Sequence, residues 1–107
     1  MKIFNLKNFI KGWIIGFFEP SIFKTHCFEV GIKEYKKGEK EKKHYHRIAK
    51  EITVVVSGKV KMNGKEFIKN DIIELEPLED CEFEAVEDSI TCVIKIPSIK
   101  NDKFEKE

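Results

Sequence analysis

A chain of 107 residues with a formal net charge of +1 is expected to form one domain and not to bind nucleic acid, because phosphate binding needs a concentrated basic face. Its 41% hydrophobic and 36% charged residues are typical of a globular protein with a solvated surface. Three unclustered cysteines argue against a disulfide framework and predict a reducing, cytoplasmic location.

The first 25 residues form an N-terminal arm that contains the apolar run FIKGWIIGFF. Lys11 and two glycines interrupt this run, and it is far shorter than the ~20 residues of a membrane span. We therefore expect no membrane contact, and instead a strand at 13–18 that packs on the rest of the domain.

Residues 26–97 give short β-rich runs separated by Gly, Asn, Asp and Pro, with no long helical periodicity. This pattern is typical of an all-β sandwich or barrel. The predicted strands cover residues 26–34, 43–47, 51–57, 59–62, 65–68, 72–75, 81–86 and 90–96. A charged tail, residues 98–107, follows and is expected to be mobile at its tip.

The Asn63-Gly64 pair between two of these runs predicts a hairpin with a two-residue turn. Such a turn fixes the register, so Val60 should lie opposite Phe67 on the buried face and Lys61 opposite Glu66 on the exposed face.

His44 and His46 lie two residues apart in a predicted strand, so their side chains should share one face. Glu51 begins the next strand, and pairing of the two strands would bring its carboxylate beside the imidazoles. Two imidazoles and a carboxylate suit a divalent transition metal. This segment therefore predicts a metal-binding pocket in a small barrel, without naming a reaction.

Further residues near this segment are candidates for binding a small molecule. Arg47, the single arginine, could bind an anionic substrate bidentately or form a surface or interface ion pair. Thr53 and Val55 share the face of Glu51 and should line the pocket. Ile52, Val54 and Val56 form a second apolar face, which indicates a homodimer through the outer sheet.

Cys81, Phe83 and Ala85 alternate with Glu82 and Glu84 in a later predicted strand. Because the carboxylates favour water, Cys81 should face the interior. In the last strand Ile90, Cys92, Ile94 and Ile96 share one face.

The spacing of Gly38, His44, His46, Glu51 and Gly58 resembles the first motif of the cupin superfamily, a group of small double-stranded β-helix or jelly-roll barrels. The resemblance covers about residues 26–96. It implies a cupin barrel over 26–97, with the arm of residues 1–25 as an N-terminal extension.

The second cupin motif is degraded in this chain. Its alignment depends on Asn70-Asp71, Pro77 and Phe83. In this alignment Cys81 stands where the family has its last histidine, and a slip of one residue would place Glu82 there.

The resemblance implies His44, His46 and Glu51 as metal ligands, with Cys81 as a fourth, and zinc, iron or nickel as the metal. We expect a metal-binding cupin that binds or transforms a small polar metabolite of carbohydrate or organic acid type, as a metal-dependent isomerase or oxygenase if it is an enzyme. Two alternatives stay open: a non-catalytic ligand-binding or regulatory cupin, and a metal-free protein like the sugar-nucleotide isomerases and epimerases, in which His44 or His46 is the general base.

Overall fold

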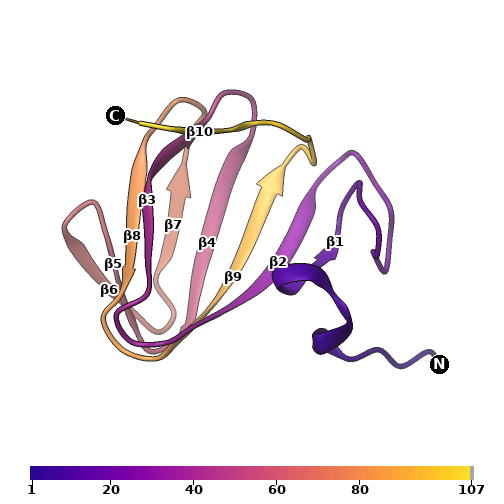
Figure 1. Ribbon diagram of the computed structural model, residues 1–107, viewed down its shortest axis with the longest axis horizontal. Coiled ribbons are helices and arrows are strands. Elements are labelled where there is room, and N and C mark those ends of the chain that lie inside the picture. The colour runs from indigo at the N-terminus through magenta and orange to yellow at the C-terminus, as the bar shows by residue number, and fades with distance from the viewer. Residues whose placement is uncertain (107) are drawn as a thin grey trace.

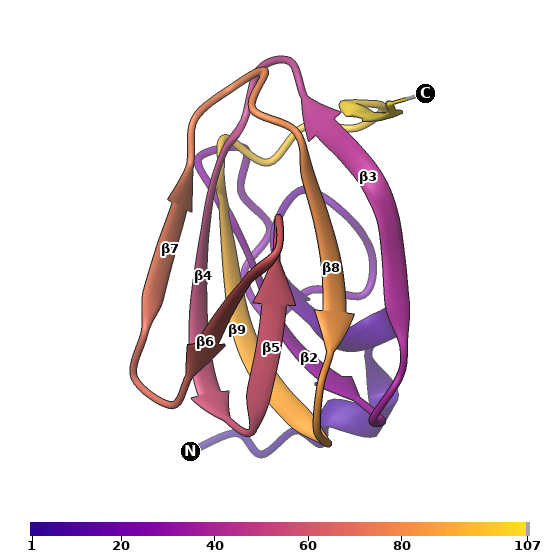
Figure 2. The same cartoon turned by 90° about the vertical axis from the view of Figure 1, so that its left-hand side faces the viewer.

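The computed structural model describes residues 1–106 and consists almost entirely of two antiparallel sheets that face each other (Figures 1 and 2). Sheet A has the strand order β1-β2-β9-β4-β7 and sheet B the order β10-β3-β8-β5-β6. The expected all-β jelly-roll barrel is confirmed. Its elements are η1 (Leu6–Asn8), η2 (Ile10–Gly12), β1 (Trp13–Ile15), β2 (Glu29–Tyr35), β3 (Lys40–His46), β4 (Lys50–Ser57), β5 (Lys59–Met62), β6 (Lys65–Ile68), β7 (Ile72–Leu75), β8 (Cys81–Ala85), β9 (Ser89–Ile96) and β10 (Lys103–Glu105).

The predicted hairpin is present between β5 and β6. Val60 lies opposite Phe67 and Lys61 opposite Glu66, as the two-residue turn requires. Val60 is fully buried and belongs to the hydrophobic core between β4 of sheet A and β5 and β8 of sheet B. The buried members of this core are Val55, Val60, Met62, Cys81, Phe83 and Ala85.

A bulge in β3 changes which side chains reach the interior. Glu41 lies opposite Phe83 and His44 opposite Cys81, so three steps along β3 match two steps along β8. Glu41 and His44 can therefore both face inward, and the two lysines between them are exposed. Simple alternation along the strand does not predict this arrangement.

Both ends of the chain pack against the barrel. β1 pairs with β2, and it ends at Ile15 rather than at the predicted residue 18 because the chain folds back there and Ile15 bridges to Phe23. At the other end, β10 pairs with the histidine segment of β3, with Lys103 opposite His46 (Figure 1). The sequence predicted this tail only as a charged extension, and its last residue, 107, lies outside the described residues.

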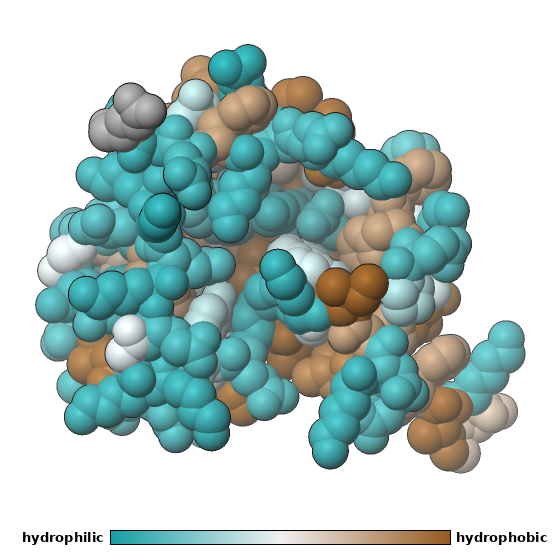
Figure 3. Space-filling view, viewed as in Figure 1, coloured by the Kyte–Doolittle hydropathy of each residue, from teal (hydrophilic) through white to brown (hydrophobic). Residues whose placement is uncertain are grey.

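The outer face of sheet A is apolar, as the second face of the 51–57 strand predicted. Ile52 and Val54 of β4 lie beside Ile94 and Cys92 of β9, and all four are partly exposed. A homodimer through this face stays a prediction. The opposite side of the molecule, seen in Figure 3, is mostly hydrophilic, with hydrophobic side chains gathered where the N-terminal arm lies. Among residues 1–106, no helix is long and apolar enough to span a membrane.

Candidate functional site

The two histidines of β3 are buried, as their spacing predicted, and their tautomers are fixed by the backbone. The Nδ1–H of His44 donates to the carbonyl of Lys42, and that of His46 donates to the carbonyl of Asp102, both at 2.9 Å. Because a carbonyl can only accept, each ring carries its proton on Nδ1 and has a lone pair on Nε2. The rings lie edge to face, with centroids 5.4 Å apart.

His46 has an unsatisfied atom in the interior. Its side chain is buried, and within residues 1–106 its Nε2 has no hydrogen-bond partner. That atom lies 3.8 Å from Oε1 of Glu51. Burial lowers the pKa of His46 to about 4, and the charge of Lys95 contributes. At neutral pH the imidazole is therefore uncharged, and its lone pair is available to a ligand.

Glu51 reaches the histidines from the opposite sheet. In β4 it lies between Leu75 of β7 and Lys95 of β9, on the inner face of sheet A. Burial raises the pKa of its carboxyl group, and the positive charge of Lys95 opposes that rise. The fold thus brings a carboxylate near the two imidazoles from the facing sheet, and not through direct pairing of the two strands, the arrangement that the sequence pattern left possible.

Cys81 lies on the neighbouring strand, directly opposite His44. Its thiol is buried and donates to the carbonyl of Glu82 at 3.3 Å, whereas the Glu82 side chain is exposed. Burial, with the negative charge of Glu51 added, raises the pKa of Cys81 to about 12. The thiol is therefore protonated at neutral pH in the absence of a cation.

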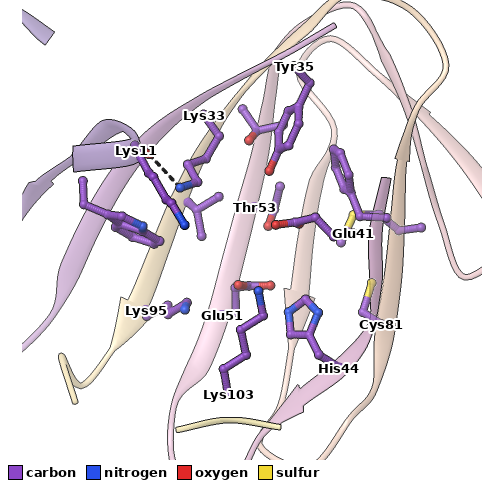
Figure 4. Close-up of a pocket in the computed structure, with 15 residues that line it drawn as sticks. Lys11, Lys33, Tyr35, Glu41, His44, Glu51, Thr53, Cys81, Lys95 and Lys103 are labelled. Atoms are coloured by element: carbon purple, nitrogen blue, oxygen red, sulfur yellow. Dashed lines mark hydrogen bonds between the residues drawn. The ribbon is translucent and has the colours of Figure 1, made fainter. Parts of the chain in front are cut away.

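A cavity of about 250 Å³ lies between the sheets (Figure 4). His44, Glu51 and Cys81 line it together with the predicted residue Thr53. His46 lies at the adjoining end of the barrel, where Ala49, Lys95 and Asp102 form a second hollow. A cavity of this volume suits a small molecule.

Two residues predicted to bind substrate do not line this cavity. Val55 is fully buried in the hydrophobic core, where it packs with Val60 and Ala85. Arg47 follows the last residue of β3 and is exposed, with its guanidinium group 4.2 Å from the ring centroid of Phe104. The alternation that assigned Val55 to the pocket was right about the inward face, but that position lies deeper than the cavity.

Sequence reasoning missed much of the cavity wall. Tyr35 of β2 and Glu41 of β3 contribute polar groups, and the arm contributes Lys11 and Trp13. Lys33, Lys95 and Lys103 enter from β2, β9 and β10 (Figure 4). The sequence pattern could have identified Lys33 and Lys95 as cavity residues. Alternation places both on the inward face of their strands, because the other face of each strand is mostly apolar.

Comparisons with known proteins identify the fold. No protein-family model and no curated protein matches the chain. Among solved structures, it is similar to a conserved protein with a double-stranded β-helix domain from Klebsiella pneumoniae, with 18% identity, 99% of this chain and 92% of that chain covered, and a TM-score of 0.72. A second similar structure is a sugar phosphate isomerase of a cupin superfamily, from Silicibacter pomeroyi. It is 19% identical, the match covers 65% of this chain and 50% of that chain, and the TM-score is 0.61.

The chain has the cupin fold. A third structure of this kind is the bacterial pirin YhhW from Escherichia coli in complex with nickel(II), which is 20% identical over 81% of this chain and 39% of its own, with a TM-score of 0.66. At these identities the likeness establishes the architecture, and the chemistry has to be argued from the residues.

Within this cupin barrel the candidate metal ligands lie near one another, but their side chains are not yet arranged around a common point. In the described part of the chain, no three His, Cys, Asp or Glu side chains are arranged as a ligand set for a metal ion. The donors nevertheless fit a divalent transition metal chemically. Two Nε2 lone pairs are held in the correct tautomer by backbone carbonyls, and a carboxylate lies beside one of them.

Proposed function

We propose that this protein is a small metal-binding cupin that binds or transforms a small polar metabolite of carbohydrate or organic acid type in the cavity. The observation that carries the proposal is the buried, unpartnered Nε2 of His46 beside Glu51. Leaving a buried polar atom without a partner costs free energy, about 1–3 kcal/mol, unless something binds it. A metal ion would satisfy this atom and would neutralise the buried carboxylate as well.

His44, His46 and Glu51 would hold the ion, and zinc, iron or nickel suits these donors. The hydrogen bonds from both Nδ1 atoms to backbone carbonyls are the outer contacts that orient metal-binding imidazoles. The nickel in the similar pirin YhhW supports this choice of metals. Once bound, the ion would supply a Lewis acid that polarises a carbonyl or activates water.

The chain's own residues prepare the cavity for a polar ligand. Burial, with the nearby carboxylates of Glu41 and Glu51, raises the pKa of Tyr35, so its hydroxyl keeps its proton and can donate. Thr53 and Glu41 add an acceptor each on facing walls. Phe83 and Val93 add apolar surface to the cavity wall, and polar contacts are stronger where apolar groups lower the local dielectric.

His46→Ala tests the proposal. The purified protein, equilibrated with buffered zinc, iron or nickel, is expected to retain close to one ion per chain. The variant should bind at least about a hundredfold more weakly, because it loses a direct ligand rather than an outer contact. His26→Ala is the matched control, since His26 is exposed and stacks on Phe17 away from the cavity. Equal retention of metal by both variants, or none by the unmodified protein, would refute the metal site.

Cys81→Ser tests whether Cys81 is a fourth metal ligand or only a buried packing residue. To coordinate a metal ion, the Cys81 thiol must lose its proton, although its pKa is about 12. The free energy of direct coordination would have to supply the cost of this ionisation. If Cys81 coordinates, the variant should lose about tenfold or more in metal affinity, and binding to the unmodified protein should release one more proton. Unchanged affinity and proton release would leave Cys81 a packing residue of the cavity wall.

A metal-free isomerase or epimerase is the second candidate, and one observation favours it. The Nε2 of His44 accepts no hydrogen bond from the protein within residues 1–106, and its ring lines the cavity, so it could take a proton from a bound substrate. The sugar phosphate isomerase of similar fold makes this chemistry worth testing. Turnover of keto-sugars by chelator-treated protein that is lost in His44→Ala would support it.

A further inference from the structure

Four lysine side chains enter the cavity, and the proposed metal chemistry uses none of them. Lys33 and Lys95 come from the inner face of sheet A, Lys11 from the arm and Lys103 from β10 (Figure 4). The carboxylates that face them are those of Glu41 and Glu51. Four positive charges therefore meet two negative ones in a partly enclosed space.

These ammonium groups are not neutralised by salt bridges. Within residues 1–106, no carboxylate oxygen lies within 4.0 Å of any of the four, and the chain's lysine salt bridges involve other lysines on the surface. Burial lowers the pKa of Lys33, and the charges of Lys95, Lys11 and Lys103 lower it further, against the opposing charge of Glu41. The site thus lacks negative charge, which a bound anion would supply.

Two of the lysines are held in place by the arm. The ammonium groups of Lys33 and Lys95 lie 4.6 and 5.1 Å from the ring centroid of Trp13, and Lys33 also donates to the carbonyl of Lys11 at 2.7 Å. The indole packs on Gly31, where a Cβ would lie 2.7 Å from it. Each ammonium group has three protons, so both lysines keep donors for a ligand.

A buried hydroxyl group faces the same space. Thr91 is 1% exposed and lines the cavity, and in the described chain its Oγ1 has no hydrogen-bond partner. It lies directly opposite Lys33 across the β2–β9 pairing. An unsatisfied hydroxyl beside an unpaired ammonium group is an arrangement that a ligand oxygen completes.

We propose that the cavity binds a small organic dianion, carrying two carboxylates or a phosphate, through Lys33, Lys95 and Thr91. The inference deepens the proposed function by naming the charge class of its ligand. The volume of about 250 Å³ suits a small ligand. The negative charge of the anion would also compensate the positive charge of the lysines that face the proposed metal site.

The test uses the single tryptophan as a reporter, because Trp13 lies between the two lysines. Succinate, inorganic phosphate and uncharged glucose are titrated into chelator-treated and metal-loaded protein, and Trp13 emission and calorimetric heat are measured. Succinate or phosphate should bind at least about tenfold more tightly than glucose, with affinity that falls as salt is added. The tighter of the two anions assigns the carboxylate or the phosphate class.

Lys33→Gln and Lys95→Gln should each weaken anion binding about tenfold or more. Lys65→Gln, on the exposed β6 strand, is the matched control and should bind as the unmodified protein does. Glucose binding as tight as that of the anions, salt-independent affinity, or unchanged binding in both lysine variants would overturn the inference. If chelator-treated protein binds the anions but does not retain metal that is added back, the metal site is refuted and the anion site stands.

Discussion

Asp102→Ala is expected to destabilise the protein by at least about 3 kcal/mol, because it removes three hydrogen bonds to a charged group, each worth about 1.5–3 kcal/mol. The Asp102 carboxylate is buried and accepts from the backbone N–H groups of Arg47, Ile48 and Ala49 at 2.9–3.2 Å. These donors form the turn between β3 and β4, and Ala49 is itself buried. Urea unfolding measures the loss, which corresponds to a decrease in Tm of roughly 12–24 °C for a domain of this size.

Two further substitutions make this prediction specific. Asp102→Asn keeps one acceptor oxygen and should lose about half as much free energy of unfolding. Asp80→Ala removes a carboxylate whose salt bridge with Lys106 lies at the surface, so it should cost less than about 1 kcal/mol. If Asp102→Ala and Asp80→Ala were equally stable, the buried carboxylate would not hold the turn.

Gly12→Ala is expected to cost about 3 kcal/mol and to loosen the arm, since overpacking costs about 1–3 kcal/mol beyond the backbone strain. Gly12 has a φ of +81°, and a Cβ there would lie 1.9 Å from the carbonyl oxygen of Ile32. The arm would have to move away from β2, taking Lys11 and Trp13 with it. Urea unfolding measures the stability, and a red shift of Trp13 emission would report exposure of the indole.

Gly38→Ala is the matched control for this clash. Gly38 also has a left-handed φ, +92°, but nothing lies within 4 Å of the position a Cβ would take. Both substitutions carry the same left-handed strain and the same change in the unfolded chain, so their difference isolates the contact with Ile32. We expect Gly12→Ala to be about 2 kcal/mol less stable than Gly38→Ala. Equal stability would mean that the arm is only loosely seated.

Local patterns in the sequence were enough to predict an all-β fold, and the resemblance to the cupin motif specified the barrel. The turn at Asn63-Gly64 fixed the β5–β6 register, and alternation placed Cys81 inside and Glu82 outside. These predictions depend on neighbours within a few residues, where backbone geometry leaves few choices. The spacing of His44, His46 and Glu51 likewise identified side chains that the fold brings close together.

The rest of the site depends on contacts between distant segments, which such patterns do not reveal. The bulge that turns Glu41 inward is set by pairing with β8, and the tautomer of His46 is set by Asp102, 56 residues later. Arg47, a candidate for binding the ligand or for a surface ion pair, follows the end of β3 and is exposed, with its guanidinium group beside the ring of Phe104. The sequence shows the pattern of each strand separately, whereas residues from several strands together line the cavity.

The pairing of β10 with β3 has a practical consequence for anyone who engineers this protein. A shortened version that stops after Pro97 would keep nearly every strand of the barrel, yet it would remove the carbonyl that holds His46 and the carboxylate that holds the neighbouring turn. Purification tags and fusion partners added after β10 would be attached to the segment that pairs with the histidine strand β3. Assays of ligand or metal binding should therefore use protein from which such additions have been cleaved.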